Sequence, residues 1–319
     1  MSRSRPHVVG FVALPIAAAV MIGCATAGAP DRTLATTADA GRAAVEGGRI
    51  PSVAYAVLRQ GAIVHGTTLG VLDRETGTRA TRRTRYEAAS LTKPVIALLV
   101  LQAVDARVLT LDEPVADTVP APRILDRERS RRVTARHLLS HSSGLPNWSG
   151  DSRDVDRTDP LTFSFDPGDA FAYSGEGYGL LGQFLEHKTG KPVADLADDL
   201  FSSLRMSASA VVAGDVGGTI ARGHFGLSPD RPAWQPDVAV PAYSLVTTAD
   251  DYGRFLEFVA NGAGLSPETL DESRRVQIWI EPSSLRGPRG PQGSPSQAAR
   301  AGRSGSRVAG ACDLRRVCA

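Results

Sequence analysis

The chain has 319 residues, of which 42% are apolar and 22% are charged. This composition is typical of a globular protein that buries a large core, and it excludes a disordered or fibrous chain. The net charge of +2 is close to neutral, and no basic run with interleaved aromatic residues marks a nucleic-acid-binding face. We therefore expect no nucleic-acid partner, and either one large domain or two interleaved ones.

The first segment, residues 1–24, has the pattern of an export signal. Two arginines precede an apolar run from Val8 to Ile22, which is too short and too interrupted for a permanent membrane span. Met21-Ile22-Gly23-Cys24 then resembles a bacterial lipobox, in which cleavage leaves Cys24 as the lipid-modified first residue. We expect an exported envelope protein whose membrane contact is a lipid anchor at Cys24. A plain secretory signal and an uncleaved anchor remain alternatives.

A linker and a first helix are expected over residues 25–48. The helix spans Leu34–Glu46 and ends at the following glycine pair. Val53–Leu58 and Ala62–Leu69 then flank the turn Arg59-Gln60-Gly61, a pattern typical of a β-hairpin. Two strands are not stable alone, so we expect them to belong to a larger antiparallel sheet.

Closely spaced apolar side chains over Ser90–Val104 favour a helix that is buried on most of its sides. Pro94 fits only in its first turn, where the backbone amides have no intrahelical acceptor to lose. The helix must therefore start near Ser90.

Residues 112–242 alternate short helical segments with loops rich in proline, glycine and aspartate, which indicates a mainly helical region. Within it, Thr134 can cap a helix over Ala135–His141, and a second helix is expected over Gly177–Lys188. A capped amphipathic helix over Tyr252–Asn261 follows this region.

The segment Ser90-Leu91-Thr92-Lys93 places a serine and a lysine three residues apart at the start of a helix. Such residues share a helix face, so the Lys93 amine can reach the Ser90 hydroxyl and remove its proton. Burial among apolar neighbours, with positive charge nearby, would lower the lysine pKa enough for this role. The amides at the helix N-terminus would stabilise an oxyanion. Alone, the motif is weak, because this spacing arises often by chance and also fits a capped surface helix.

Three further segments follow this motif. They are Arg136-His137-Leu138-Leu139-Ser140-His141-Ser142-Ser143-Gly144-Leu145-Pro146, then Pro167-Gly168 with Phe171-Ala172-Tyr173-Ser174-Gly175-Glu176-Gly177-Tyr178-Gly179-Leu180-Leu181-Gly182, and Ala242-Tyr243-Ser244-Leu245-Val246-Thr247-Thr248-Ala249-Asp250-Asp251. With them, the chain resembles the class C β-lactamase and DD-peptidase-like family from about Gly48 to Pro282. The resemblance implies an α/β fold of the β-lactamase/transpeptidase type, with an antiparallel sheet flanked by helices and a mainly helical domain.

By this resemblance, Ser90 is the acylated nucleophile, Lys93 is its base, and Tyr173 is a second acid/base group between Ser90 and the leaving group. A phenol needs a lowered pKa for that role, and a neighbouring Lys93 ammonium would supply it. A core aromatic residue before a helix is the alternative for Tyr173. At the position of Gly175 the family usually has an asparagine whose side-chain amide contacts the substrate. In this chain that substrate contact is either missing or made by a water molecule. That departure argues against efficient β-lactamase activity.

Two other motifs receive structural interpretations. His137 and His141 could face one metal, but no acidic third ligand is suitably placed, so we expect no metal and assign His141 and Ser142 to the helix end. Lys188-Thr189-Gly190 spells the third motif of the superfamily, which in the family lies on a strand far downstream. Here the tripeptide ends a helix shortly after Tyr173, and we assign it no catalytic role.

The last segment, residues 286–319, has seven arginines, one acidic residue and no histidine, lysine or tryptophan. It shows no helical or strand periodicity and predicts a basic disordered tail. The resemblance requires a third motif and the last sheet strands here, and none can be recognised, so we expect these strands to be missing. Either the reading frame shifts near Leu285-Arg286, or a degenerate homologue carries a natural basic tail. The Cys312 and Cys318 pair has no neighbouring cluster of metal ligands.

The sequence thus predicts a hydrolase domain over residues 49–285. The main hypothesis is a serine acyl-transfer hydrolase without a cofactor, whose partner is a small-molecule or peptide substrate: a β-lactam, a D-Ala-D-Ala-type peptide or a small ester. The alternative is a catalytically inactive envelope-associated protein, either a pseudoenzyme or a truncated or frameshifted product.

Overall fold

The computed structural model describes residues 32–151, 154, 156–212, 219–223 and 237–280, together with the backbone of 308–311. The predicted export signal with Cys24 lies outside the described residues, so the lipid anchor and the predicted domain boundaries stay predictions. Within the described ranges, no helix has the length and apolar character needed to cross a membrane.

The described part of the chain opens with a helix and a hairpin, and both predictions are confirmed. Helix α1 spans Arg32–Glu46, and strands β1 (Ser52–Arg59) and β2 (Ala62–Gly70) pair antiparallel. Gln60 and Gly61 form the turn, with φ angles of 50° and 77°. Positive φ at both central residues gives the turn the twist that the two strands require.

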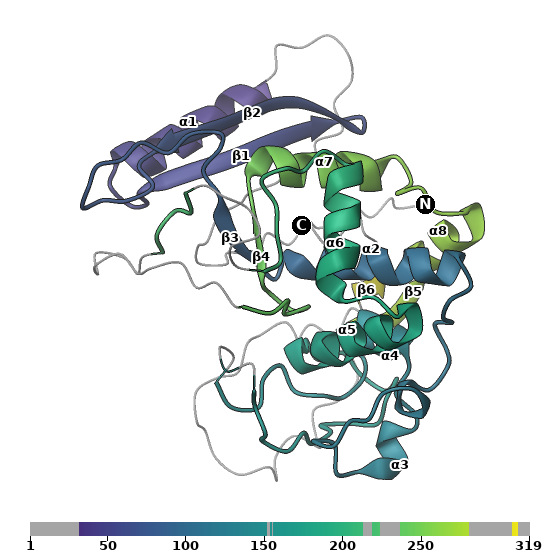
Figure 1. The fold of residues 1–319 in the computed structure, drawn as a ribbon. Coiled ribbons are helices and arrows are strands. Elements are labelled where there is room, and N and C mark those ends of the chain that lie inside the picture. The colour runs from purple at the N-terminus through teal and green to yellow at the C-terminus, as the bar shows by residue number, and fades with distance from the viewer. Residues whose placement is uncertain are drawn as a thin grey trace, which may run out of the picture.

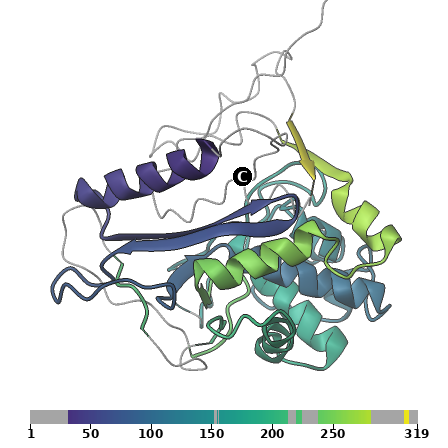
Figure 2. The same cartoon turned by 90° about the horizontal axis from the view of Figure 1, so that it is seen from above.

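Two helices cover the hairpin, one on each face (Figures 1 and 2). Residues Val53–Leu58 of β1 are all buried, which requires cover on both sides because successive side chains point to opposite faces. Helix α1 covers one face and α7 (Ala249–Ala260) covers the other. Helix α7 starts three residues before its predicted position, because the Thr248 side chain accepts from the Asp251 amide and caps it there.

Helix α2 (Thr92–Asp105) forms the centre of the core. It begins just after Ser90, as Pro94 requires, and its residues from Thr92 to Leu101 are all buried. Helices α5 (Gly175–Thr189) and α6 (Val193–Ser203) pack against it. A helix buried on most of its sides was the prediction for this segment, and it is confirmed.

Among its described residues, region 112–242 consists of helices joined by long loops and contains no extended strand. Besides α5 and α6 it contains the short helices α3 (Arg127–Ser130) and α4 (Ala135–Leu139) and a 3₁₀ turn, Val115–Asp117. Thr134 caps α4 as predicted. The helix ends before its predicted limit, because His141 adopts the left-handed conformation with a φ of 55°.

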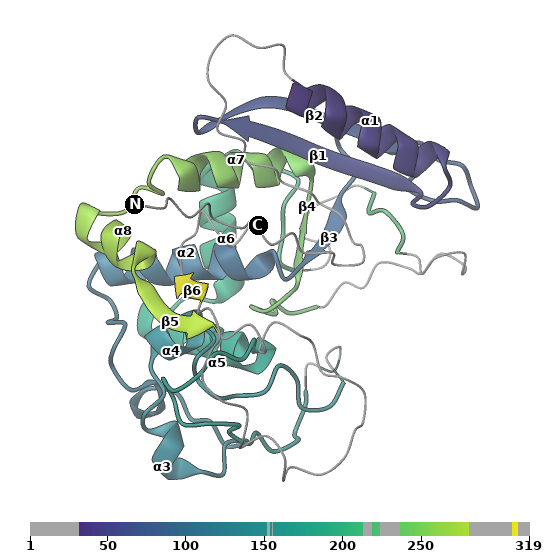
Figure 3. The same cartoon turned by 180° about the vertical axis from the view of Figure 1, so that it is seen from behind.

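The remaining strands form two short antiparallel pairs. Strand β3 (Tyr86–Ala89) pairs with β4 (Leu245–Thr247), and β5 (Val276–Ile280), which follows helix α8 (Pro267–Arg274), pairs with β6 (Val308–Ala311). Figure 3 shows β5 and β6 side by side. Strand β6 corrects the prediction that the last segment contains no regular structure. Strands pair through backbone N–H and C=O groups. Residues 308–311 can therefore form a strand although their side chains show no strand periodicity in the sequence.

The burial of α2 generates a stability prediction. Leu98 has no exposed surface, whereas Leu125 is 68% exposed. We expect Leu98→Ala to lower the free energy of unfolding by about 2–5 kcal/mol, because it leaves a cavity in the core. The matched control Leu125→Ala should change it by less than about 0.5 kcal/mol. Urea unfolding measures both values, and equal losses would contradict the central position of α2.

Candidate active site

Ser90 lies at the junction between β3 and α2, with its side chain exposed. The preceding residue, Ala89, has a φ of 45°, a conformation that residues with a Cβ rarely adopt. The buried Thr92 hydroxyl holds this bend by donating to the Ala89 carbonyl at 2.6 Å and accepting from the Leu245 amide at 2.9 Å. The β3–β4 pair and the start of α2 therefore fix the position of Ser90 together.

Lys93 brings a buried amine to this junction. Its side chain is 4% exposed, and Nζ lies 3.3 Å from Ser90 Oγ and donates to the Ala242 carbonyl at 2.8 Å. Burial lowers the pKa of Lys93 from 10.5 to about 7. The predicted serine–lysine contact and the direction of the pKa shift are confirmed, and burial is the cause of the shift. The Ala242 carbonyl was not predicted as a lysine acceptor, because backbone groups carry no sequence signal.

Tyr173 joins the same group of side chains. Its hydroxyl is hydrogen-bonded to Ser90, and its ring centroid lies 4.6 Å from Lys93 Nζ. Tyr173 keeps 41% of its surface exposed, but the partial desolvation of its hydroxyl still raises its pKa, and the hydrogen bond from Ser90 offsets this only in part. The predicted lowering of the tyrosine pKa is therefore wrong. A lysine with a pKa near 7 is largely neutral under the conditions where it acts as a base, so it supplies little charge to ionise the phenol.

His141 packs against Tyr173. The two ring centroids are 4.4 Å apart, the Tyr178 ring lies 5.1 Å from His141, and His141 Nδ1 accepts from the Ser174 amide at 3.1 Å. Burial, followed by the charge of Lys93, lowers the pKa of His141 to about 3. The imidazole is thus neutral, with its proton on Nε2. The sequence predicted that His141 closes a helix end; its side chain also holds the segment that carries Tyr173.

Gly175 is the first residue of α5, two positions after Tyr173. Its amide donates to Asn147, to the carbonyl at 3.1 Å and to Oδ1 at 3.0 Å. A Cβ at this glycine would lie 2.4 Å from ring atoms of Trp148. The indole therefore occupies the place of the asparagine side chain that the resemblance leads one to expect. The role of Gly175 as a substrate-binding position stays a prediction.

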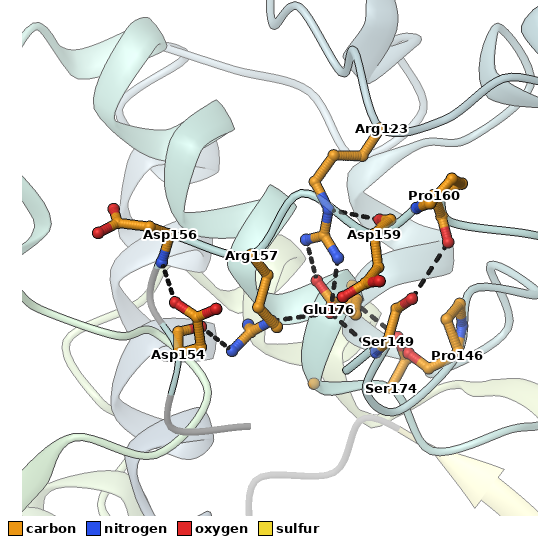
Figure 4. Close-up of polar contacts among 12 residues, drawn as sticks. Arg123, Pro146, Ser149, Asp154, Asp156, Arg157, Asp159, Pro160, Ser174 and Glu176 are labelled. Carbon is orange, nitrogen blue, oxygen red and sulfur yellow. Dashed lines mark hydrogen bonds and ion pairs between the residues drawn. The ribbon is translucent and has the colours of Figure 1, made fainter. Parts of the chain in front are cut away.

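A buried ion-pair cluster holds the start of α5 (Figure 4). Glu176 is 5% exposed and lies 2.8 Å from Arg123 and 3.2 Å from Arg157, and it accepts from the Ser149 amide at 3.1 Å. Figure 4 shows both guanidinium groups pointing at this one carboxylate from separate segments. Sequence reasoning missed the cluster, because isolated arginines in loops follow no pattern.

A cavity of about 380 Å³ opens beside the ion-pair cluster, lined by Arg123, Arg157 and Glu176 among others. None of the predicted catalytic side chains lines it. The cavity is therefore separate from the chemistry at Ser90.

The motifs with structural interpretations lie where they were predicted. Lys188 is in the last turn of α5 and pairs with Glu113 at 2.9 Å, so the third-motif lookalike ends a helix. His137 Nδ1 accepts from the Thr134 amide in a reciprocal cap of α4.

Comparison with known proteins gives the family. The family model described as Beta-lactamase matches residues 37–302. Two curated relatives are penicillin-binding protein 4 of Amycolatopsis lactamdurans and esterase EstB of Burkholderia gladioli. The first is 34% identical over 65% of this chain and 58% of its own length, and the second is 31% identical over 75% of this chain and 73% of its own length. The chain thus spans less than two thirds of the first relative.

Solved structures support the same fold. A penicillin-binding protein homologue from Pyrococcus abyssi matches 77% of this chain and 61% of its own with a TM-score of 0.66 and 21% identity. The D-alanine carboxypeptidase AmpC from Burkholderia cenocepacia matches 76% of this chain and 69% of its own with a TM-score of 0.63 and 23% identity. The chain belongs to the Beta-lactamase family and has its transpeptidase-like α/β fold. Its relatives place it in the serine-hydrolase superfamily of β-lactamases, penicillin-binding proteins and esterases.

The lowered lysine pKa generates a pH prediction. Lys93 can accept a proton only when neutral, so the rate of Ser90 acylation should rise with pH and reach half its maximum near the pKa of about 7. His141, with a pKa of about 3, and Tyr173, with a raised pKa, should not titrate between about pH 5 and pH 9. Rates of covalent labelling across this range test it; a midpoint near that of an ordinary lysine would contradict the role of burial.

The histidine contacts generate another prediction. His141→Ala removes the rings' contact and the acceptor for the Ser174 amide, and should cost about 2–4 kcal/mol of unfolding free energy. We expect it to slow Ser90 acylation at least about tenfold, because Tyr173 loses its support. His141→Asn is the matched variant, since asparagine tolerates the left-handed backbone at this position and keeps an acceptor. His141→Asn should therefore lower the free energy of unfolding by less than His141→Ala does. Equal losses of unfolding free energy in the two variants would contradict a contribution from the hydrogen bond to Ser174.

Proposed function

We propose that the chain is a serine hydrolase that forms an acyl-enzyme on Ser90, with a β-lactam, a D-Ala-D-Ala-type peptide or a small ester as substrate. The observation that carries this proposal is the Lys93 amine, which lies 3.3 Å from Ser90 Oγ with a pKa of about 7. A base with a pKa near neutrality is suited to proton transfer at physiological pH. An ordinary surface lysine would be fully protonated there.

The proposed acylation uses the three side chains in order. Neutral Lys93 takes the Ser90 hydroxyl proton as Oγ attacks the substrate carbonyl carbon and forms the new C–O bond. The bond from that carbon to the leaving oxygen or nitrogen then breaks. The proton passes from the Lys93 ammonium through the Tyr173 hydroxyl to the leaving group, and water later hydrolyses the ester to Ser90.

Protonated tyrosine suits this relay. Its raised pKa keeps the phenol neutral, so the hydroxyl can donate its proton to the leaving group and regain one from the Lys93 ammonium, whose Nζ lies 4.6 Å from the tyrosine ring centroid. The Ala242 carbonyl holds the lysine amine in place from the other side. The N-terminal end of α2, which carries the positive end of the helix dipole, begins two residues after Ser90 and favours the oxyanion that forms at the carbonyl.

The relatives support both ester and peptide-like substrates. Their names describe a penicillin-binding protein and an esterase, and the esterase aligns with the larger share of its own length. The export pattern and Cys24 support an additional proposal, that the protein works at the cell envelope through a lipid anchor.

A specific observation favours an inactive protein as the second candidate. Residues 286–319 contain no lysine or histidine that could form the family's third motif. In that case Ser90 and Lys93 would be retained without acyl transfer.

Covalent labelling separates the two candidates. We expect the full chain to form an adduct with a fluorescent penicillin or a fluorophosphonate probe, and Ser90→Ala to form none. Lys93→Met should slow labelling at least about 100-fold, the range typical for loss of a general base, while leaving the protein folded. Intact-mass measurement detects the adduct. If the folded wild-type chain gains no Ser90-dependent adduct with any of these probes, the hydrolase proposal is wrong.

A further inference from the structure

Trp148 occupies a place beside the catalytic group that its sequence position did not reveal. Its ring atoms would lie 2.4 Å from a Cβ at Gly175, two residues after Tyr173. The indole also contacts Tyr243, whose ring centroid lies 5.3 Å away in an edge-to-face arrangement. Tyr243 directly follows Ala242, the acceptor of the Lys93 amine. The indole therefore lies between the segment that carries Tyr173 and the segment that holds Lys93.

The loop that carries Trp148 is held on both sides of this residue. Before it, the Ser174 hydroxyl donates to the Pro146 carbonyl at 2.8 Å, and Asn147 accepts from the Gly175 amide. After it, the Ser149 amide donates to Glu176 at 3.1 Å (Figure 4). Loop residues on both sides of Trp148 are thus bonded to three consecutive residues, 174–176, at the start of α5.

The charge cluster also fixes the indole directly. The Arg157 guanidinium lies 5.0 Å from the Trp148 ring centroid and also contacts Glu176 at 3.2 Å. A cation stacked on an aromatic face and paired with a buried carboxylate holds the ring in one orientation. The indole is half-buried against the core and keeps one part of its surface accessible.

We propose that the Trp148 ring is the apolar wall of the acyl-binding side of the Ser90 site, and that it favours esters with long apolar acyl chains over short ones. This inference rests on the proposed function. An asparagine amide at position 175 could bond a substrate amide, whereas here the indole takes that place and both Asn147 oxygens beside it already accept from backbone amides at the start of α5. When a β-lactam or peptide binds with its amide side chain against the indole, the polar groups of that amide have no hydrogen-bond partner. An alkyl chain in the same position loses no hydrogen bond.

The test compares two acyl chains in one covalent step. p-Nitrophenyl acetate and p-nitrophenyl octanoate each acylate Ser90 as its Oγ bonds the carbonyl carbon, the ester C–O bond breaks and p-nitrophenolate leaves. The burst of p-nitrophenolate and the intact mass report this step without requiring turnover. We expect Trp148→Ala to lower the octanoate-to-acetate ratio of acylation rates at least about tenfold, and to raise labelling by a fluorescent penicillin.

Three further variants act as controls. Gly175→Ala displaces the Trp148 ring, and to a smaller extent the Asn147 carbonyl, so it should lower the same ratio of acylation rates. Trp148→Phe retains an apolar ring and should keep most of that ratio. Trp279→Ala removes an indole that is half-exposed on β5 and should leave the ratio unchanged. If Trp148→Ala does not fold, the octanoate-to-acetate ratios of Gly175→Ala and Trp148→Phe test the role of Trp148 instead.

The outcomes separate the inference from the proposed function. A wild-type chain that acetate does not acylate at Ser90 contradicts both. A chain that acetate does acylate, but whose ratio stays within about twofold in Trp148→Ala and Gly175→Ala, retains the hydrolase proposal and overturns the role of Trp148.

Discussion

Lys93 carries an amine into the interior, with the Ala242 carbonyl and the Ser90 hydroxyl as its hydrogen-bond partners. A charge in such a place is costly, so the amine gives up its proton near pH 7. The Ser90 partner depends on the strained bend at Ala89, close to the lysine in sequence. The Ala242 partner comes from the segment before β4, 149 residues away. The arrangement of β3, β4 and α2 is therefore what makes the lysine a base.

The other side of the site depends on the start of α5. Tyr173 is placed by the rings and the hydrogen bond of His141, and the next three residues are bonded to the loop that begins at Pro146. The buried Glu176 binds two arginines and this loop together (Figure 4). A buried carboxylate with two cations requires well-placed hydrogen bonds to be favourable, and its partners supply them. The result is a rigid support for the tyrosine and for Trp148.

The raised pKa of Tyr173 changes the role expected for this residue from an acid/base group with a lowered pKa to a neutral proton donor. A phenolate would compete with the lysine for the serine proton, whereas a neutral phenol can pass a proton onward. With His141 also neutral, the lysine is the group at this site that titrates near pH 7. The base and the proton donor are thus distinguished by how burial acts on an amine and on a phenol: it lowers the pKa of the first and raises that of the second.

The sequence alone determined the local features. Apolar spacing predicted the hairpin and α2, Pro94 placed the start of α2, and the Ser90–Lys93 spacing predicted their contact, because periodicity and helix geometry act over a few residues. Tertiary structure alone decided the Ala242 acceptor, the charge state of Tyr173, the Glu176 cluster and the Trp148 ring over Gly175. Each joins residues distant in sequence through backbone groups or burial, which leave no pattern in the chain. Strand β6 formed for the same reason, since its pairing with β5 requires only backbone hydrogen bonds.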